Sequence, residues 1–172
     1  MAEALATVAR LDGLGMITIR ADLSRSGDAI AEAAGLAIPD ATRISTDGSR
    51  SLGWMSPDEL LLILPAQETP DAIAALEQAL AAEHALIADV SDARAVFEVI
   101  GDHASDVIAK LSPAHLDALP QDGLRRSRAA QTAAAFWRVD GGFRLIGFRS
   151  TADYLDLVLQ SAACPGSGLA PR

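Results

Sequence analysis

Residues 50–64 read RSLGWMSPDELLLIL, two apolar runs joined by Ser56-Pro57-Asp58. The runs Arg50–Met55 and Glu59–Leu64 have the length and apolar content of β-strands. A proline at the second position of a turn has its φ preset, and Ser56 can accept a hydrogen bond from the turn's backbone. We therefore predict a β-hairpin here, with its turn at residues 56–58.

The segments that flank this hairpin predict one strand and two helices. Met16–Leu23 alternates β-branched residues with others, as a half-buried strand does. Apolar residues at helical spacing indicate a helix over Asp28–Ala34, and Gly35 follows where a helix C-cap prefers glycine. A second helix is predicted to open at Thr69, the expected N-cap, with Pro70 at its first helical position.

The second half of the chain shows the same order of elements. The predicted segments are a strand at 95–100, a helix at 102–111, a polar connection at 114–129 and hairpin strands at 132–139 and 143–148. Asp140-Gly141-Gly142 supplies the positive φ angles that a tight hairpin turn needs. Ser150-Thr151-Ala152-Asp153 resembles a capping box and is predicted to open the final helix.

The two halves also share short strings at nearly constant spacing. GDAIAE (27–32) matches SDVIAK (105–110) at an offset of 78, and Trp54 and Leu62 match Trp137 and Leu145 at an offset of 83. Each half alone would be a small sheet with one uncovered face, so two halves together would bury a shared core. We predict an α+β fold of two repeated strand-helix-strand-strand-helix, ferredoxin-like half-units packed into one domain. Chance similarity between two α+β stretches is the alternative.

These patterns set the expected boundaries along the chain. Residues 1–15 form an N-terminal segment, and 16–160 form the domain, with half-units at about 16–84 and 85–160. Residues 161–172 are rich in Pro, Gly and Ser and are expected to be a flexible tail.

Charge and hydropathy restrict the class of partner. The chain has 172 residues, of which half are hydrophobic. It carries 14 basic and 23 acidic side chains, which gives a net charge of −9. Duplex nucleic acid and anionic membranes need a concentrated positive field, so we expect neither as a partner. No apolar run nears the roughly 20 residues of a membrane helix. Residues 1–10 lack the pattern of a secretory signal, so we expect a cytoplasmic protein.

Residues of catalytic or metal-binding types occur, but not in the spacing that such chemistry requires. The candidates are His84, His103, His115, the pairs Asp58/Glu59 and Asp89/Asp92, and the single cysteine, Cys164. The histidines lack a helical i, i+4 pairing, and a metal would also need a fourth ligand. Nothing in the sequence marks a raised pKa at either carboxylate pair. One cysteine excludes an internal disulfide and a multi-cysteine metal site.

The glycine pairs and the lone lysine do not form a nucleotide site. Gly13-Leu14-Gly15 lacks the third glycine of a dinucleotide fingerprint and precedes a strand, so it is predicted to be a turn. Gly166-Ser167-Gly168 lies in the tail without the strand that precedes a nucleophile elbow. Lys110, the only lysine, falls inside a predicted helix. We therefore predict no catalytic, cofactor-binding or metal-binding residue on this chain.

Arginines form the most suggestive group of side chains. Arg125, Arg126 and Arg128 crowd the connecting segment, and Arg138, Arg144 and Arg149 lie on or next to the following hairpin. In an acidic protein such a cluster could bind a partner's carboxylates through planar, bidentate contacts. A solvated sheet face, with arginine stems packed on apolar neighbours, is an equal alternative.

The two tryptophans, Trp54 and Trp137, each flank a predicted hairpin at equivalent positions of the repeat. We expect both in the core, because one face of each hairpin must be covered. Anchors of an interface are the alternative.

Three strings resemble the gamma subunit of heterotetrameric sarcosine oxidase. They are LGWMSPDELLLIL at 52–64, DVSDAR at 89–94 leading into VFEVIG at 96–101, and FRSTADYL at 148–155. Together the matches stretch from about residue 15 to residue 159, nearly all of the chain outside its ends. Related motifs occur in the folate-binding domain of aminomethyltransferase-like proteins, to which this family is distantly similar.

The resemblance implies a non-catalytic subunit with an assembly role. The whole enzyme of this family demethylates sarcosine oxidatively to glycine, reduces oxygen to hydrogen peroxide and passes the methyl carbon to tetrahydrofolate. In the family, the alpha and beta subunits hold FAD, FMN, NAD and the folate site, and delta holds zinc. Gamma holds no cofactor and docks mainly on alpha. No catalytic residue is therefore carried over to this sequence.

Two other functions stay open. A stand-alone folate-binding protein of one-carbon metabolism is suggested by the pattern shared with aminomethyltransferase-like domains. A pterin pocket is, however, hard to build from the seven aromatic residues present. A small-molecule regulatory module is suggested because paired βα units often bind amino acids, here sarcosine or glycine.

Overall fold

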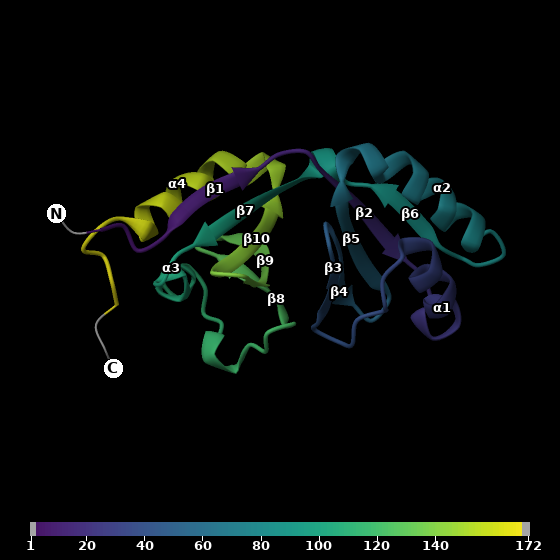
Figure 1. The fold of residues 1–172 in the computed structure, drawn as a ribbon, viewed down its shortest axis with the longest axis horizontal. Helices are drawn as coiled ribbons and strands as arrows, with labels where there is room; N and C mark the ends of the chain where they lie inside the picture. The colour runs from purple at the N-terminus through teal and green to yellow at the C-terminus, as the bar shows by residue number, and fades with distance from the viewer. Residues whose placement is uncertain (1–2, 170–172) are drawn as a thin grey trace. The chain divides into compact units, whose positions relative to one another are not determined.

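Figure 1 shows two antiparallel β-sheets, each accompanied by α-helices, in the computed structural model, which describes residues 3–169. Internal contacts divide these elements between two compact units. We call Gly13–Asp92 the continuous unit, and the residues before 13 together with those from 93 onward the discontinuous unit. The predicted α+β class is confirmed.

The continuous unit builds a five-stranded sheet and two helices around an aliphatic core. Its elements are β2 (Leu14–Arg20), α1 (Leu23–Ala34), β3 (Ile44–Asp47), β4 (Arg50–Ser56), β5 (Glu59–Pro65), α2 (Thr69–Ala79) and β6 (Leu86–Asp89). The strands lie in the order β3-β4-β5-β2-β6. Ile17, Ile19 and Leu62 from the sheet share one core cluster with Ile30 of α1 and Leu76 of α2, and all five are fully buried. Both helices therefore cover the same face of this sheet.

The discontinuous unit has the same composition of elements but a more aromatic core. Its elements are β1 (Thr7–Leu11), β7 (Arg94–Ile100), α3 (Ala104–Leu111), β8 (Leu124–Ala129), β9 (Thr132–Val139), β10 (Gly142–Phe148) and α4 (Ala152–Ala163). The strands lie in the order β1-β7-β10-β9-β8. Phe97, Phe136 and Phe143 of the sheet share one buried cluster with Leu155 and Leu159 of α4. The rings of Phe136 and Phe143 meet edge to face, with centroids 6.4 Å apart.

The two sheets have the same topology. In each, one strand (β2 or β7) lies between the last strand of a three-stranded meander and a fifth, outer strand. The outer strand is β6, which follows α2, in the continuous unit, but β1 in the discontinuous unit. The segment predicted at residues 1–15 therefore supplies β1 to one sheet and the start of β2 to the other.

Both predicted hairpins are confirmed. β4 and β5 pair across Pro57-Asp58, and β9 and β10 pair across Asp140-Gly141, where Gly141 has a φ of 72°. Gly13, in the predicted turn before β2, also has a positive φ, 72°.

Four strands were not predicted: β1, β3, β6 and β8. β8 takes the place of the last part of the polar connection expected at 114–129. The segments ISTD of β3 and LRRSRA of β8 lack a clear apolar alternation. They are strands because the next strand along the chain, β4 for β3 and β9 for β8, supplies the backbone pairing.

The boundary between β2 and α1 differs from the prediction. Leu23 belongs to the helix, which starts five residues before the predicted start at Asp28. The reason is Asp22, whose carboxylate accepts from the backbone N–H of Ser24 at 3.0 Å and so caps the helix. The predicted C-cap is confirmed, since Gly35 is left-handed with a φ of 69°.

Neither predicted capping residue at the second helix of each half forms its cap. Thr69 is helical, with φ −57° and ψ −46°, because a 3₁₀ turn at Ala66–Glu68 leads directly into α2. Its hydroxyl instead lies against Gly15. At α4 the N-cap is Thr151, whose hydroxyl bonds to the carbonyl oxygen of Phe148 rather than to a helix N–H. The capping box is therefore absent.

Both tryptophans face protein interior, as expected, but they are not equivalent. Trp137 is 3% exposed, and Trp54 packs partly buried against the core of the continuous unit. When Leu62 and Leu145 are matched, the strand registers place Trp54 in correspondence with Arg138 rather than Trp137. The proposed equivalence of Trp54 and Trp137 is therefore wrong by one residue. A shift of one residue along a strand moves the side chain to the opposite face of the sheet.

Candidate functional site

An open groove of about 1190 Å³ lies in the continuous unit. Three segments line it: residues 20–25 at the junction of β2 and α1, residues 57–58 in the β4–β5 turn, and residues 82–86 between α2 and β6. No local sequence pattern marks this groove, because its walls come from three segments that are far apart in the chain.

The charged side chains of the groove are paired across it. Arg20 Nη2 donates to Asp58 Oδ2 at 2.9 Å, and Arg25 Nη2 lies 3.2 Å from a carboxylate oxygen of Glu83. Ser56 Oγ donates to Asp58 Oδ1 at 2.7 Å. The Ser56 hydrogen bond, and after it the bond from Arg20, hold the pKa of Asp58 below its ordinary value. Asp58 is therefore an ionised acceptor and is poorly suited to act as a general acid.

Asp22, the second carboxylate of the groove with a lowered pKa, also has a structural role. Asp22 accepts from the hydroxyl of Ser24 at 2.6 Å as well as from its N–H. These bonds, the hydroxyl's first, lower the pKa of Asp22. The groove thus holds ionised carboxylates that fix a turn and a helix start.

The other carboxylate pair considered as an acid–base pair closes a turn. Asp89 Oδ1 accepts from the N–H of Ser91 at 2.9 Å, and Ser91 Oγ accepts from the N–H of Met16 at 2.9 Å. Asp92 is exposed in the next turn. Neither carboxylate lines the groove of the continuous unit, and Asp89 serves the junction of β6 with β2.

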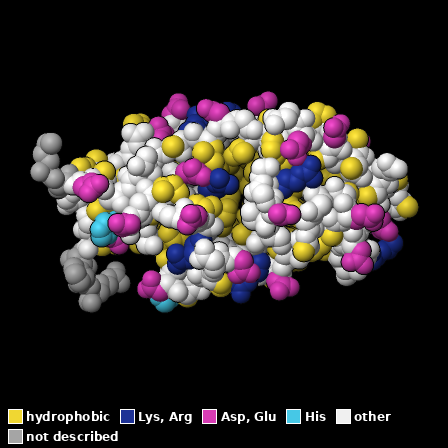
Figure 2. Space-filling model, viewed as in Figure 1, with side chains coloured by type: hydrophobic (Ala, Val, Ile, Leu, Met, Phe, Trp, Pro, Cys, Tyr) yellow, Lys and Arg dark blue, Asp and Glu magenta, His cyan; other side chains and the backbone are white. Residues whose placement is uncertain are grey.

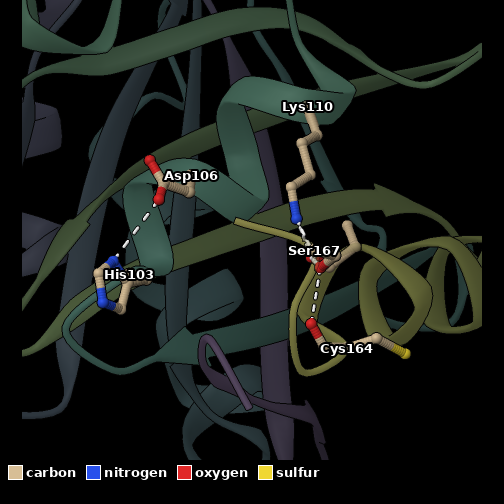
Figure 3. Close-up of polar contacts among 6 residues, drawn as sticks. His103, Asp106, Lys110, Cys164 and Ser167 are labelled. Atoms are coloured by element: carbon tan, nitrogen blue, oxygen red, sulfur yellow. Dashed lines mark hydrogen bonds and ion pairs between the residues drawn. The ribbon is translucent and has the colours of Figure 1, made fainter. Parts of the chain in front are cut away.

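The three histidines lie in three separate connecting segments. His84 lines the groove of the continuous unit, whereas His103 and His115 belong to the other unit. His103 Nδ1 lies 3.5 Å from Asp106 Oδ2, as Figure 3 shows, and His115 Nε2 lies 3.9 Å from Asp117. Within residues 3–169, no three or more His, Cys, Asp or Glu side chains gather in a way that could hold a metal ion.

Lys110 ties the C-terminal segment to the discontinuous unit (Figure 3). Its Nζ donates to the carbonyl oxygen of Ala162 at 2.6 Å and to Ser167 Oγ at 2.8 Å. The Ser167 hydroxyl in turn donates to the carbonyl oxygen of Cys164 at 2.6 Å. Lys110 therefore places its positive charge at the C-terminal end of α4, where carbonyl groups lack helical partners.

The flexible tail predicted from residue 161 is wrong in its first part. Residues 161–163 form the last turn of α4, and Ser167 is held by Lys110. The last part of the predicted tail, residues 170–172, lies outside the described residues. Sequence reasoning missed the Lys110–Ser167 contact because the two residues are 57 positions apart and nothing local marks it.

Arg144 and Arg138, two arginines of the predicted cluster, hold parts of the discontinuous unit together. Arg144 donates from Nε and Nη2 to Glu98 Oε1 on the neighbouring strand, at 2.9 and 2.7 Å. Arg138 Nη2 donates to the carbonyl oxygen of Leu116 at 2.9 Å, and its guanidinium lies 5.1 Å from the Phe143 ring centroid. These two therefore stabilise the sheet and the connection before β8.

The remaining arginines are exposed. Arg149 lies in the 3₁₀ turn before α4, and Arg125, Arg126 and Arg128 lie on β8. Figure 2 shows acidic side chains scattered over the visible face with basic ones between them. Against this background, three arginines on one six-residue strand are a local reversal of charge.

In the described part of the chain, no helix combines the length and the apolar character that crossing a membrane requires.

The fold and these surfaces define the class of protein. A subunit in the structure of heterotetrameric sarcosine oxidase from Corynebacterium sp. U-96 in complex with pyrrole 2-carboxylate is 24% identical, with a TM-score of 0.86 over 97% of this chain and 88% of that one. Glycine cleavage system aminomethyltransferase T from Bartonella henselae is 15% identical, with a TM-score of 0.69 over 92% of this chain and 46% of that one. A chain of aspartokinase alpha and beta subunits is 13% identical, with a TM-score of 0.53 over 91% and 92%. The fold is thus aminomethyltransferase-like, and this chain spans about half of the aminomethyltransferase.

The family follows from sequence. The model of the sarcosine oxidase, gamma subunit family matches residues 20–165, most of the chain. The chain therefore belongs to the sarcosine oxidase gamma subunit family, as its three strings indicated. A search of curated proteins found no match.

Proposed function

We propose that this chain is the non-catalytic gamma subunit of a heterotetrameric sarcosine oxidase, and that it helps to assemble and stabilise the complex. The family match over residues 20–165 carries this proposal. In the proposed complex, the chain docks mainly on the alpha subunit, with beta and delta as further partners. FAD, FMN, NAD and zinc belong to those other subunits, and the complex is expected in the cytoplasm.

The reaction proposed for the whole complex is oxidative demethylation of sarcosine to glycine, with tetrahydrofolate as acceptor of the one-carbon unit and hydrogen peroxide as product. The polar groups described above support an accessory role for this chain. Asp22, Asp58 and Asp89 are engaged in a helix cap and two turns, and Arg138 and Arg144 hold backbone and strands together.

A stand-alone folate-binding protein is the second candidate, favoured by the fold shared with aminomethyltransferase T. Ligand pockets are mostly apolar with a few precisely placed polar groups, and for a pterin we expect a buried carboxylate among them. Every aspartate and glutamate between residues 3 and 169 is at least partly exposed, which favours the accessory role. Calorimetric titration of the purified chain with tetrahydrofolate decides between them: measurable heat with a matching thermal shift would support the folate candidate.

Co-expression with the alpha, beta and delta subunits tests the main proposal. With an affinity tag on the alpha subunit, we expect this chain to co-purify and to elute with the others in size-exclusion chromatography. The control is the tagged alpha subunit expressed with this chain alone. A stable subunit interface buries about 1,600 Å² or more, so the complex should survive dilution into the column.

Two results would overturn the proposal. The first is a chain that elutes as a free monomer while the other three subunits assemble and oxidise sarcosine fully. The second is a purified, flavin-free chain that itself converts sarcosine.

A further inference from the structure

β8 combines an open sheet edge with a concentration of positive charge. Among residues 3–169, its only strand partner is β9, which pairs through Leu124↔Trp137 to Ala129↔Thr132. Leu124 and Ala129 are 3% and 1% exposed, so both ends of the strand are fixed in the core. Arg125, Arg126 and Arg128 are exposed between these ends. The strand is therefore held in place while its arginines face solvent.

This charge pattern is peculiar to β8 among the terminal strands of the two sheets. β1, at the opposite end of the same sheet, carries one arginine, Arg10, which lies 3.9 Å from Asp153. In the continuous unit, the terminal strands β3 and β6 each end in an aspartate, Asp47 and Asp89. β8 holds three arginines and no acidic residue in six positions of a chain whose net charge is −9.

The strand register distributes the arginines over both faces of the sheet edge. Side chains alternate along a strand, so Arg126 and Arg128 share one face and Arg125 lies on the other. Arg126 also makes a contact within the chain, so the guanidinium groups considered for a partner are those of Arg125 and Arg128. A segment that lies along the edge would find one guanidinium on each of its own two faces.

We infer that β8 is a docking site for an acidic, extended segment of a partner subunit, which pairs with the strand edge and places carboxylates against Arg125 and Arg128. The inference rests on the proposed function, because it requires that partner subunits exist. Strand addition satisfies the unpaired backbone groups of an edge, and arginine binds carboxylates through two parallel hydrogen bonds. An acidic segment would also bring the opposite charge to a strand that carries three arginines in an acidic protein.

Charge reversal with matched controls tests the docking site. The variants are Arg128→Glu, the double variant Arg125→Glu/Arg128→Glu, and Arg10→Glu, which makes the same single reversal on the opposite terminal strand. Each full-length variant is titrated onto the tagged complex of the other three subunits. We expect the double variant to bind at least about tenfold more weakly than wild type, and Arg10→Glu to stay within about twofold. Thermal unfolding of each free variant confirms that it is folded.

Hydrogen exchange supplies the second readout. On assembly, the amides of residues 124–129 should become protected from exchange, because a paired strand closes the edge. Equal binding by wild type and the double variant, or unchanged exchange at residues 124–129, would overturn the inference and would show that the arginines only shield an exposed edge. If wild type itself does not bind the other subunits, the proposed function fails instead.

Discussion

Gly142, the first residue of β10, is fixed by the backbone next to it. A Cβ at this position would overlap the carbonyl oxygen of Val99 and lie 3.0 Å from Ile100 Cα, and a paired backbone gives way less easily than a side chain. We expect Gly142→Ala to destabilise the protein by about 1–3 kcal/mol, as overpacking does. Chemical denaturation of the full-length chain measures this.

Gly27 in α1 provides the control for that substitution. A Cβ there meets only Ile38 Cγ1, at 3.7 Å, and the residue lies inside a helix. Gly27→Ala should therefore stabilise the protein by about 0.5–1 kcal/mol, because alanine loses less backbone entropy than glycine. Similar losses of stability in both variants would contradict the steric account.

Asp58 should make part of the stability depend on pH. Its pKa is lowered in the folded protein from an ordinary value of 3.8, first by the Ser56 hydrogen bond and then by Arg20. A carboxylate of this kind contributes stability above its unfolded pKa and loses it as the pH falls through the folded pKa. Asp58→Asn should therefore be less stable than wild type at neutral pH, with a difference that shrinks below about pH 4.

Urea denaturation from neutral pH to about pH 3 checks this expectation. Ser56→Ala keeps the carboxylate but removes the largest cause of the shift, so it should give an intermediate pH dependence. A difference between wild type and Asp58→Asn that is the same at every pH would show that Asp58 acts through packing alone.

At the scale of the element, α1 contains a hydroxyl without a partner. Ser26 is 2% exposed, and its Oγ has no hydrogen-bond partner. A buried, unpaired hydroxyl is costly, and alanine favours a helix more than serine does. We expect Ser26→Ala to raise stability by about 1 kcal/mol. Thermal unfolding measures the change, and a loss of stability would indicate a hidden partner such as an ordered water.

The end of α4 depends on a residue of α3. Removing the Lys110 ammonium with Lys110→Met should cost about 1 kcal/mol, because the Ala162 carbonyl loses a charged donor at a helix C-terminus. Hydrogen exchange should increase in the last turn of α4, and proteolysis after residue 163 should become faster. Lys110→Arg keeps the charge and serves as the control. Equal exchange in all three proteins would mean that Lys110 does not anchor this segment.

Local sequence patterns predicted the hairpins but not the starts of two helices. The hairpin at 50–64 and the hairpin turn at 140–141 were predicted because Pro57 and Gly141 act through local backbone geometry. The caps at Thr69 and Ser150 were predicted wrongly. Local sequence allows a cap at either position, but the preceding 3₁₀ turns decide where the chain enters the helix. The conformation of a turn depends on its own residues, whereas the start of a helix also depends on the conformation of the segment before it.

For the whole molecule, the proposed accessory role predicts a change in the lifetime of the complex. A partner that binds only the assembled state stabilises that state by mass action. We expect the alpha, beta and delta subunits prepared without this chain to lose sarcosine oxidation several-fold faster on warming. Adding the purified chain should restore the lifetime. Identical inactivation rates with and without it would contradict a stabilising role.

The amino-acid sequence by itself determined the α+β class, both hairpins, the C-cap at Gly35 and the family, because each depends on residues that are close together in the chain. Only the tertiary structure decided that residues 7–11 complete a sheet begun at residue 94, that Trp54 corresponds to Arg138, and that Lys110 reaches Ser167. The arginines of β8 were visible in the sequence, but their place on a terminal strand was not. The physical reason is that sheet order and side-chain contacts join segments that are far apart in the chain and leave no local sequence signal, whereas a hairpin turn acts through its own backbone.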